Sequence, residues 1–174
     1  MPALDAVILT PPPAVTRFEA SRAGNSRMQV DVLGALENLD RIRKYVQGQR
    51  LALKPFVETP RDYILDGQND GIENSAEDLI LLDQTISAML EAEEKVAREL
   101  KYLRFHLPRW PKGTNPAFLG AGREAHNLLV GWAEDLRDAR WNVMALRAEL
   151  RPGTDVSGEG SVSDLRRAVN AMRA

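Results

Sequence analysis

Residues 79–107, LILLDQTISAMLEAEEKVARELKYLRFHL, decide the fold expected for this chain. Apolar residues recur in this stretch at alternating steps of three and four, which is the spacing of one face of an α-helix. Glu93 is the one polar member of a series that otherwise consists of Leu79, Leu82, Ile86, Met89, Val96, Leu100, Leu103 and Leu107. A stripe sustained for about four heptads predicts a long amphipathic helix with coiled-coil-like packing against other helices.

A second series with the same spacing follows between residues 122 and 150. Its members are Gly122, Ala125, Leu129, Trp132, Leu136, Ala139, Val143, Leu146 and Leu150. The two series are separated by a short segment that contains Pro108, Pro111 and Pro116. Two long helical patterns with a short connection predict antiparallel neighbours. An arm of roughly 30 residues would span about 45 Å.

Three further segments complete the expected all-α architecture. A shorter helix is expected over residues 28–49, because apolar residues from Met28 to Val46 line one face. Gly48 marks its expected C-terminal end. Pro55 and Pro60 predict a break after it, with only a turn or two over residues 59–65. Residues 1–27 predict an extended or flexible N-terminal arm, and partial docking on the bundle is favoured over disorder of the whole arm. Residues 163–172 predict a short C-terminal helix after a Gly/Ser-rich linker. The resulting three-helix-type bundle covers residues 28–152, flanked by an arm at 1–27 and a tail at 153–174.

Composition excludes several classes of function. The net charge is only −2, so neither nucleic acid nor an anionic membrane is expected as a partner. The absence of cysteine excludes disulfides, thiolate catalysis and cysteine metal sites. No window approaches 18 consecutive apolar residues, and the N-terminus lacks the pattern of a secretory signal. The cytoplasm is therefore the expected location.

Residues 66–77, DGQNDGIENSAE, have the spacing of a calcium-binding loop. Asp66, Gln68, Asp70 and Glu77 place oxygen donors at loop positions one, three, five and twelve, and Gly71 falls at the sharp turn. The stretch resembles an EF-hand loop over these twelve residues, and the resemblance implies calcium as a ligand. An Asp/Asn/Gly-rich turn that leads into a capped helix explains the same residues without a metal.

The turn between the two long helices is the candidate partner-binding site. Trp110 lies there among Arg104, Arg109 and Lys112, and tryptophan and arginine are the residue types that most often anchor protein interfaces. They also stack and pair with single-stranded nucleic acid. Alternatively, Trp110 folds back and closes the end of the bundle. Acidic residues concentrate between positions 55 and 83 and basic residues between 95 and 123, which predicts a bundle with one acidic and one basic end.

Glu93 and Trp132 are the candidate buried polar pair. Antiparallel pairing across the turn places them close together, so the Glu93 carboxylate is expected to accept a hydrogen bond from the indole N–H of Trp132. Alternatively, Glu93 reaches solvent at the edge of the helix interface. A catalytic carboxylate would need a second titratable partner, and none is evident in the sequence.

The sequence favours a non-enzymatic helical interaction protein: an adaptor, assembly factor or regulator that binds a protein partner through the turn and the terminal arms. A homo-oligomer is also expected, because Leu81, Leu90 and Trp141 widen the apolar stripes beyond what one short first helix covers. Two alternatives stay open. One is a calcium-binding protein that uses the 66–77 loop. The other is an enzyme or small-ligand carrier with a pocket near Glu93 and Trp132.

Overall fold

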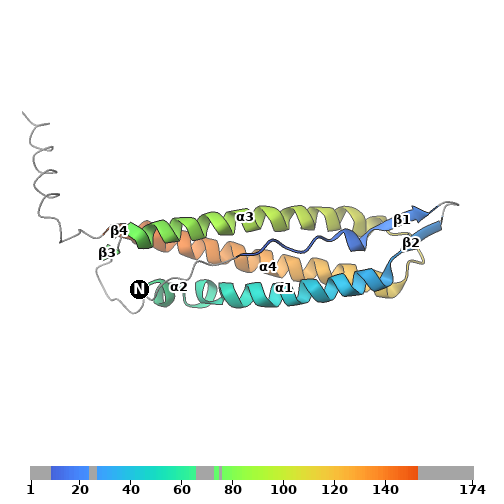
Figure 1. The fold of residues 1–174 in the computed structure, drawn as a ribbon, viewed down its shortest axis with the longest axis horizontal. Coiled ribbons are helices and arrows are strands. Elements are labelled where there is room, and N and C mark those ends of the chain that lie inside the picture. Colours follow the sequence, from blue (N-terminus) through green and yellow to red (C-terminus); the bar gives the residue numbers. More distant parts are fainter. Residues whose placement is uncertain (1–8, 24–26, 66–72, 75, 153–174) are drawn as a thin grey trace, which may run out of the picture.

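The computed structural model describes residues 9–23, 27–65, 73–74 and 76–152, and it confirms the expected all-α bundle. Its three long helices are α1 (Val32–Glu58), α3 (Ala76–His106) and α4 (Pro116–Glu149). Figure 1 shows them as one elongated bundle in which α4 packs against both α1 and α3. The 3₁₀ turn η2 (Leu107–Arg109) and the residues after it connect α3 to the antiparallel α4, as the proline-rich segment predicted.

Helix α4 is the central element of the core. Every position of its predicted apolar series is buried, from Gly122 to Leu150. Its first turn is capped by Asn115, whose Oδ1 accepts from the N–H of Ala117 at 2.9 Å, and Pro116 begins the helix where no backbone donor is needed. The sequence pattern therefore predicted this helix face correctly along its whole length.

On α3 the buried line differs from the predicted seam by one residue at two places. Thr85 and Ala92 are buried, whereas their predicted neighbours Ile86 and Glu93 are only partly buried. An α-helix has 3.6 residues per turn, so a strict heptad line drifts around a straight helix by about 20° per repeat. The Thr85 hydroxyl is satisfied inside the helix, where it donates to the carbonyl of Leu81 at 2.9 Å.

Helix α1 starts later and ends later than the sequence predicted. Asp31 caps it by accepting from the N–H of Gly34 at 2.8 Å, which places the first helical residue at Val32 rather than Met28. The helix continues through Gly48 and Pro55 to Glu58. Burial of Leu53 and Phe56 stabilises these last turns, and this tertiary packing offsets the backbone hydrogen bond that Pro55 removes. The short helix α2 (Pro60–Leu65) then forms where a turn or two was expected.

Short strands lie at the two ends of the bundle. At one end β1 (Ala20–Ala23) and β2 (Arg27–Val30) form an antiparallel pair in which Ala20 lies opposite Val30. At the other end β3 (Glu73–Asn74) pairs in parallel with β4 (Arg151–Pro152). The sequence pattern indicated neither pair, because strands of two to four residues are too short to show alternation.

The extended N-terminal arm is present over residues 9–23, with a single 3₁₀ turn, η1 (Thr16–Phe18), before β1. Figure 1 shows the arm running lengthwise between α1 and α3. Val15 and Phe18 are buried in the core, so the arm is docked on the bundle as expected. The expected C-terminal helix at 163–172 lies outside the described residues. Within the described ranges, none of the helices is both long enough and apolar enough to cross a membrane.

Candidate functional site

Trp110, the candidate anchor at the turn, folds back onto the end of the bundle. Its Nε1 donates to the carbonyl of Phe18 at 3.0 Å, and its ring lies against Phe118 with the ring centroids 4.7 Å apart. The side chain is half-buried. Of the alternatives that the sequence left open, the structure contains the one in which Trp110 closes the bundle end. Partner binding by Trp110 stays a prediction.

The basic residues of the turn do not converge on Trp110. Arg109 lies over the ring of Phe105, 3.7 Å from its centroid, and donates to the carbonyl of the same residue. Arg104 reaches across to α4, where its Nε lies 3.4 Å from Nε2 of His126. Lys112 is exposed. The expected basic patch around Trp110 is therefore not formed by these residues: Arg109 and Arg104 contact other side chains instead.

The candidate calcium loop lies almost wholly outside the described residues. This holds for Asp66, Gln68 and Asp70, while Glu77 is described only as part of the α3 backbone. Calcium binding by this loop stays a prediction. Elsewhere in the described chain, no three acidic or histidine side chains are grouped so that they could hold a metal ion.

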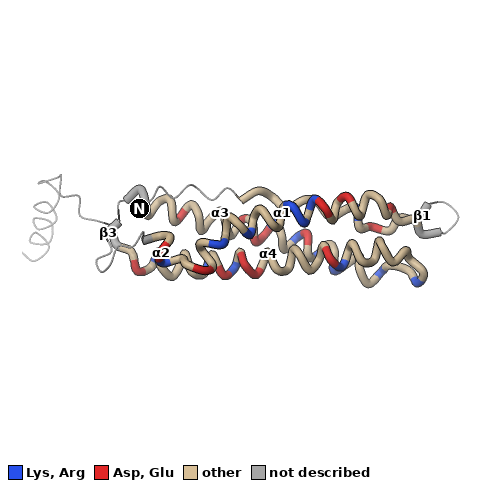
Figure 2. Tube along the Cα trace, turned by 90° about the horizontal axis from the view of Figure 1, so that it is seen from below, with Lys and Arg blue, Asp and Glu red and all other residues tan. Residues whose placement is uncertain are grey.

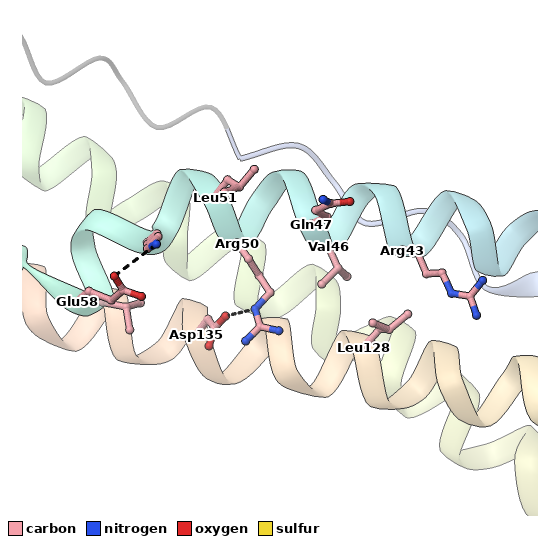
Figure 3. Close-up of a pocket in the computed structure, with 10 residues that line it drawn as sticks. Arg43, Val46, Gln47, Arg50, Leu51, Glu58, Leu128 and Asp135 are labelled. Atoms are coloured by element: carbon pink, nitrogen blue, oxygen red, sulfur yellow. Dashed lines mark hydrogen bonds and ion pairs between the residues drawn. The ribbon is translucent and has the colours of Figure 1, made fainter.

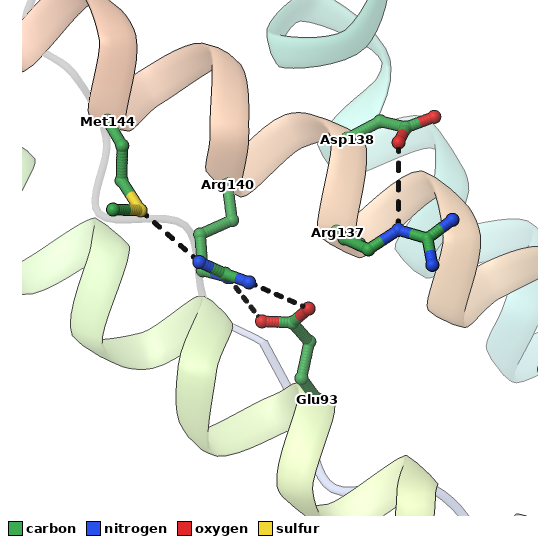
Figure 4. Close-up of polar contacts among 5 residues, drawn as sticks. All are labelled: Glu93, Arg137, Asp138, Arg140 and Met144. Carbon is green, nitrogen blue, oxygen red and sulfur yellow. Dashed lines mark hydrogen bonds and ion pairs between the residues drawn. The ribbon is translucent and has the colours of Figure 1, made fainter.

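Glu93 pairs with Arg140 of α4 and does not accept from Trp132. Figure 4 shows the Arg140 guanidinium meeting the Glu93 carboxylate with two nitrogens: Nε contacts Oε2, and Nη2 donates to Oε1 at 3.3 Å. The one-residue shift of the buried line on α3 places Glu93 at the α3–α4 edge, whereas Trp132 packs edge-on against Tyr45 of α1, with ring centroids 5.3 Å apart. The predicted hydrogen bond is therefore wrong. Among the described residues, the buried Nε1 of Trp132 has no acceptor.

Removing Glu93 should destabilise the bundle, because the Arg140 side chain is only 15 % exposed and would lose its counter-charge. We expect Glu93→Ala to lower the free energy of unfolding by about 1–3 kcal/mol, since an unpaired, largely buried charge is costly. Glu94→Ala, at the adjacent exposed position, is the matched control and should leave stability unchanged. Urea unfolding followed by circular dichroism measures both. Equal midpoints for the two variants would show that the pair contributes nothing.

The expected pocket near Glu93 and Trp132 is an open groove of about 340 Å³ between α3 and α4. Glu93 lines it together with Leu100 and Val130, but Trp132 does not. Trp132 instead lies on the opposite side of α4, toward α1. Glu93 therefore lies at the α3–α4 interface and Trp132 at the α1–α4 interface. A catalytic or ligand-carrying role for the pair stays a prediction.

A larger groove of about 470 Å³ lies between α1 and α4 (Figure 3). Val46 and Leu128 contribute apolar surface, and three bases of α1 line it. Each base faces a carboxylate: Arg43 lies 2.6 Å from Glu124, Arg50 lies 2.5 Å from Asp135, and Lys54 lies 3.7 Å from Glu58. Because three bases meet three acids, the groove offers little net charge with which to select an ionic ligand.

The expected acidic and basic ends of the bundle stay a prediction, because Asp66 and Asp70 of the acidic segment lie outside the described residues. Figure 2 shows acidic and basic residues interspersed along the helices. The C-terminal half of α4 supplies bases beside the acidic segment: Arg147 donates to Asp83 at 2.9 Å. Arg61 of α2 lies 2.9 Å from Glu149 in the same region. Because α4 runs antiparallel to α3, its C-terminal half lies beside the start of α3, and Arg147 there meets Asp83 of the acidic segment.

Three exposed apolar residues of α3 and α4 form the surface that we call the Trp141 face. They are Trp141, Met144 and Leu90, which are 58 %, 36 % and 44 % exposed. The Glu93–Arg140 and Asp83–Arg147 pairs bracket Leu90 on α3 and Met144 on α4, and Trp141 is one helical turn from Met144.

The Arg140 guanidinium lies near two of the three apolar members of the Trp141 face. Arg140 Nη1 lies 3.2 Å from the Met144 sulfur, and the guanidinium carbon lies 5.4 Å from the centroid of the Trp141 ring. The sequence pattern pointed to Leu90 and Trp141 but missed Met144 and Arg140, which look like ordinary surface positions until the partner helix is in place. No protein-family model, curated protein or solved structure matches this chain.

Proposed function

We propose that this chain is a non-enzymatic helical interaction protein, serving as an adaptor, assembly factor or regulator, and that it binds protein through the Trp141 face. One observation carries the proposal: Trp141 is 58 % exposed, and Arg140 lies between it and the partly exposed Met144. Tryptophan, methionine and arginine are enriched at the centres of protein interfaces, and large exposed apolar groups mark interaction sites.

A second copy of the chain is the partner that fits this face best. Both signs of charge lie around Trp141, as Arg140 with Glu93 and Arg147 with Asp83. A two-fold contact brings the same patch together from both molecules, so a patch that carries both signs can be complementary to itself. A partner whose surface carries a high net charge of one sign would find no net electrostatic attraction to such a balanced surface. The cytoplasm remains the expected location of this assembly.

Trp141→Ala should weaken self-association without affecting the fold. We expect the dimer dissociation constant to rise about 30-fold, which corresponds to about 2 kcal/mol for the two tryptophans that a two-fold dimer loses together. Sedimentation velocity over a range of chain concentrations measures the constant. Circular dichroism should show the same helicity for the variant, because the Trp141 side chain is not part of the core.

Leu33→Ala is the control for this experiment. Among the described residues, Leu33 is the most exposed large apolar residue, at 68 %, but it lies on α1 and outside the Trp141 face. The control should dimerise as the unaltered chain does. A chain that stays monomeric at every concentration, or a Leu33→Ala loss as large as that of Trp141→Ala, would contradict the proposal.

A further inference from the structure

The backbone of the N-terminal arm is hydrogen-bonded by four side chains in a groove between α1 and α3. Side chains of α1, of α3 and of the turn after η2 bind main-chain groups of residues 10–18. The four contacts are Tyr45 Oη to the Thr10 carbonyl at 2.8 Å, Asn38 Nδ2 to the Ala14 carbonyl at 3.1 Å, the Val15 N–H to Glu99 Oε2 at 3.2 Å, and Trp110 Nε1 to the Phe18 carbonyl at 3.0 Å. Such contacts recognise an extended chain rather than a particular sequence.

Side-chain recognition in the groove rests on two anchors. Val15 and Phe18, three residues apart, are buried against the helices. Arg17, between them, points outward to Asp31, 3.1 Å away. Burial raises the pKa of Tyr45, so its phenol keeps the proton that it donates to the arm up to a higher pH than an ordinary tyrosine would.

The groove has more hydrogen-bonding capacity than the arm uses. The buried amide oxygens of Asn38 and Gln49 have no donor among the described residues, although the nitrogens of both amides bind the arm. These amides contact Ala14 and Thr10, and the residues between those two points are Pro11, Pro12 and Pro13. Proline has no backbone N–H, so this part of the arm cannot donate to either oxygen.

We infer that the α1–α3 groove is a binding site for an extended segment of a partner protein, with the arm as its built-in occupant. The segment that fits carries an aliphatic and an aromatic residue three positions apart, where the arm has Val15 and Phe18. It also keeps its backbone N–H groups at the positions of Pro11 to Pro13, and so satisfies the two amide oxygens that the arm leaves without donors. The groove is separate from the Trp141 face, and its function does not depend on that face.

Two labelled peptides test the inference. One has the arm sequence of residues 9–19, LTPPPAVTRFE, and the other replaces its three prolines by alanine, LTAAAAVTRFE. Each is titrated with the full chain and with its Phe18→Ala variant, which weakens the internal arm, and fluorescence anisotropy reports binding. We expect both peptides to bind the variant more tightly than the unaltered chain, since the weakened arm competes less. The alanine peptide should bind about tenfold tighter than the arm peptide, because it adds donors for two buried acceptors.

Three controls keep the result interpretable. Val15→Ala weakens the arm independently and replaces Phe18→Ala if that variant does not fold. Asn38→Ala should reduce the difference between the two peptides, and Trp141→Ala should leave both affinities unchanged, which separates this inference from the proposed dimer.

The inference is overturned if neither peptide binds the weakened-arm variant, or if the two peptides bind equally. A further outcome also overturns it. If the Trp141→Ala chain still sediments as a dimer and becomes a monomer when Phe18→Ala is added, the groove belongs to the arm of a second copy rather than to a different protein.

Discussion

Trp132→Ala lowers the free energy of unfolding by about 3–5 kcal/mol, the loss expected when a fully buried tryptophan is truncated. Trp132 is wholly buried in the middle of α4, where it packs edge-on against Tyr45 of α1. Truncation leaves a cavity in the α1–α4 interface, which is the most extensive helix contact of the bundle. Urea unfolding monitored by circular dichroism measures the loss as a lower transition midpoint.

Trp132→Phe is the matched variant, and it should cost less than about 1.5 kcal/mol. Phenylalanine keeps most of the ring volume and removes the indole N–H, which has no acceptor among the described residues. Deleting an unsatisfied buried donor offsets part of the lost packing. A phenylalanine variant as unstable as the alanine variant would show that the Nε1 of Trp132 is hydrogen-bonded in solution.

Gly122→Ala should destabilise the chain by about 1–3 kcal/mol, although alanine is the better helix former. A Cβ at Gly122 would lie 2.1 Å from Cη2 of Trp110 and 3.1 Å from Cδ2 of Leu107. The indole is rigid and is tied to the Phe18 carbonyl, so it has to leave its place at the bundle end. Thermal unfolding gives the loss of stability, and a red shift of tryptophan fluorescence reports the exposed ring.

Gly120→Ala, two residues earlier on the same helix, is the control and should have the opposite sign. A Cβ at Gly120 would meet no atom within 4 Å. Only the helix propensity changes there, which stabilises by up to about 1 kcal/mol. If both glycine variants were stabilised, Trp110 would not occupy its place over Gly122 in solution.

The buried face of α4 was predictable from the sequence because it depends on local periodicity alone. A face that stays apolar from Gly122 to Leu150 has to be covered, and a proline-rich turn brings the preceding helix back to cover it. The non-helical course of residues 11–13 was also predictable, because three successive prolines lack the backbone N–H groups that a helix needs.

The contacts that carry the proposals depended on tertiary structure, because each joins residues far apart in the chain. Local residue preferences predicted that α1 ends at Gly48, whereas the helix continues to Glu58 because Leu53 and Phe56 are buried in the core. Trp110 looked like an exposed anchor, yet the Phe18 carbonyl, 92 residues earlier in the chain, holds it at the bundle end.

The long amphipathic helices and the non-helical arm were predictable from local sequence alone, because helix periodicity and proline geometry act within a few residues. The packing of the helices and the arm was needed to establish that Trp110 closes the bundle end and that Glu93 meets Arg140 rather than Trp132. The physical reason is the rotation of each helix about its own axis. A shift of one residue in the buried line turns a side chain by about 100°, and that shift is set by the packing of all the neighbouring elements together.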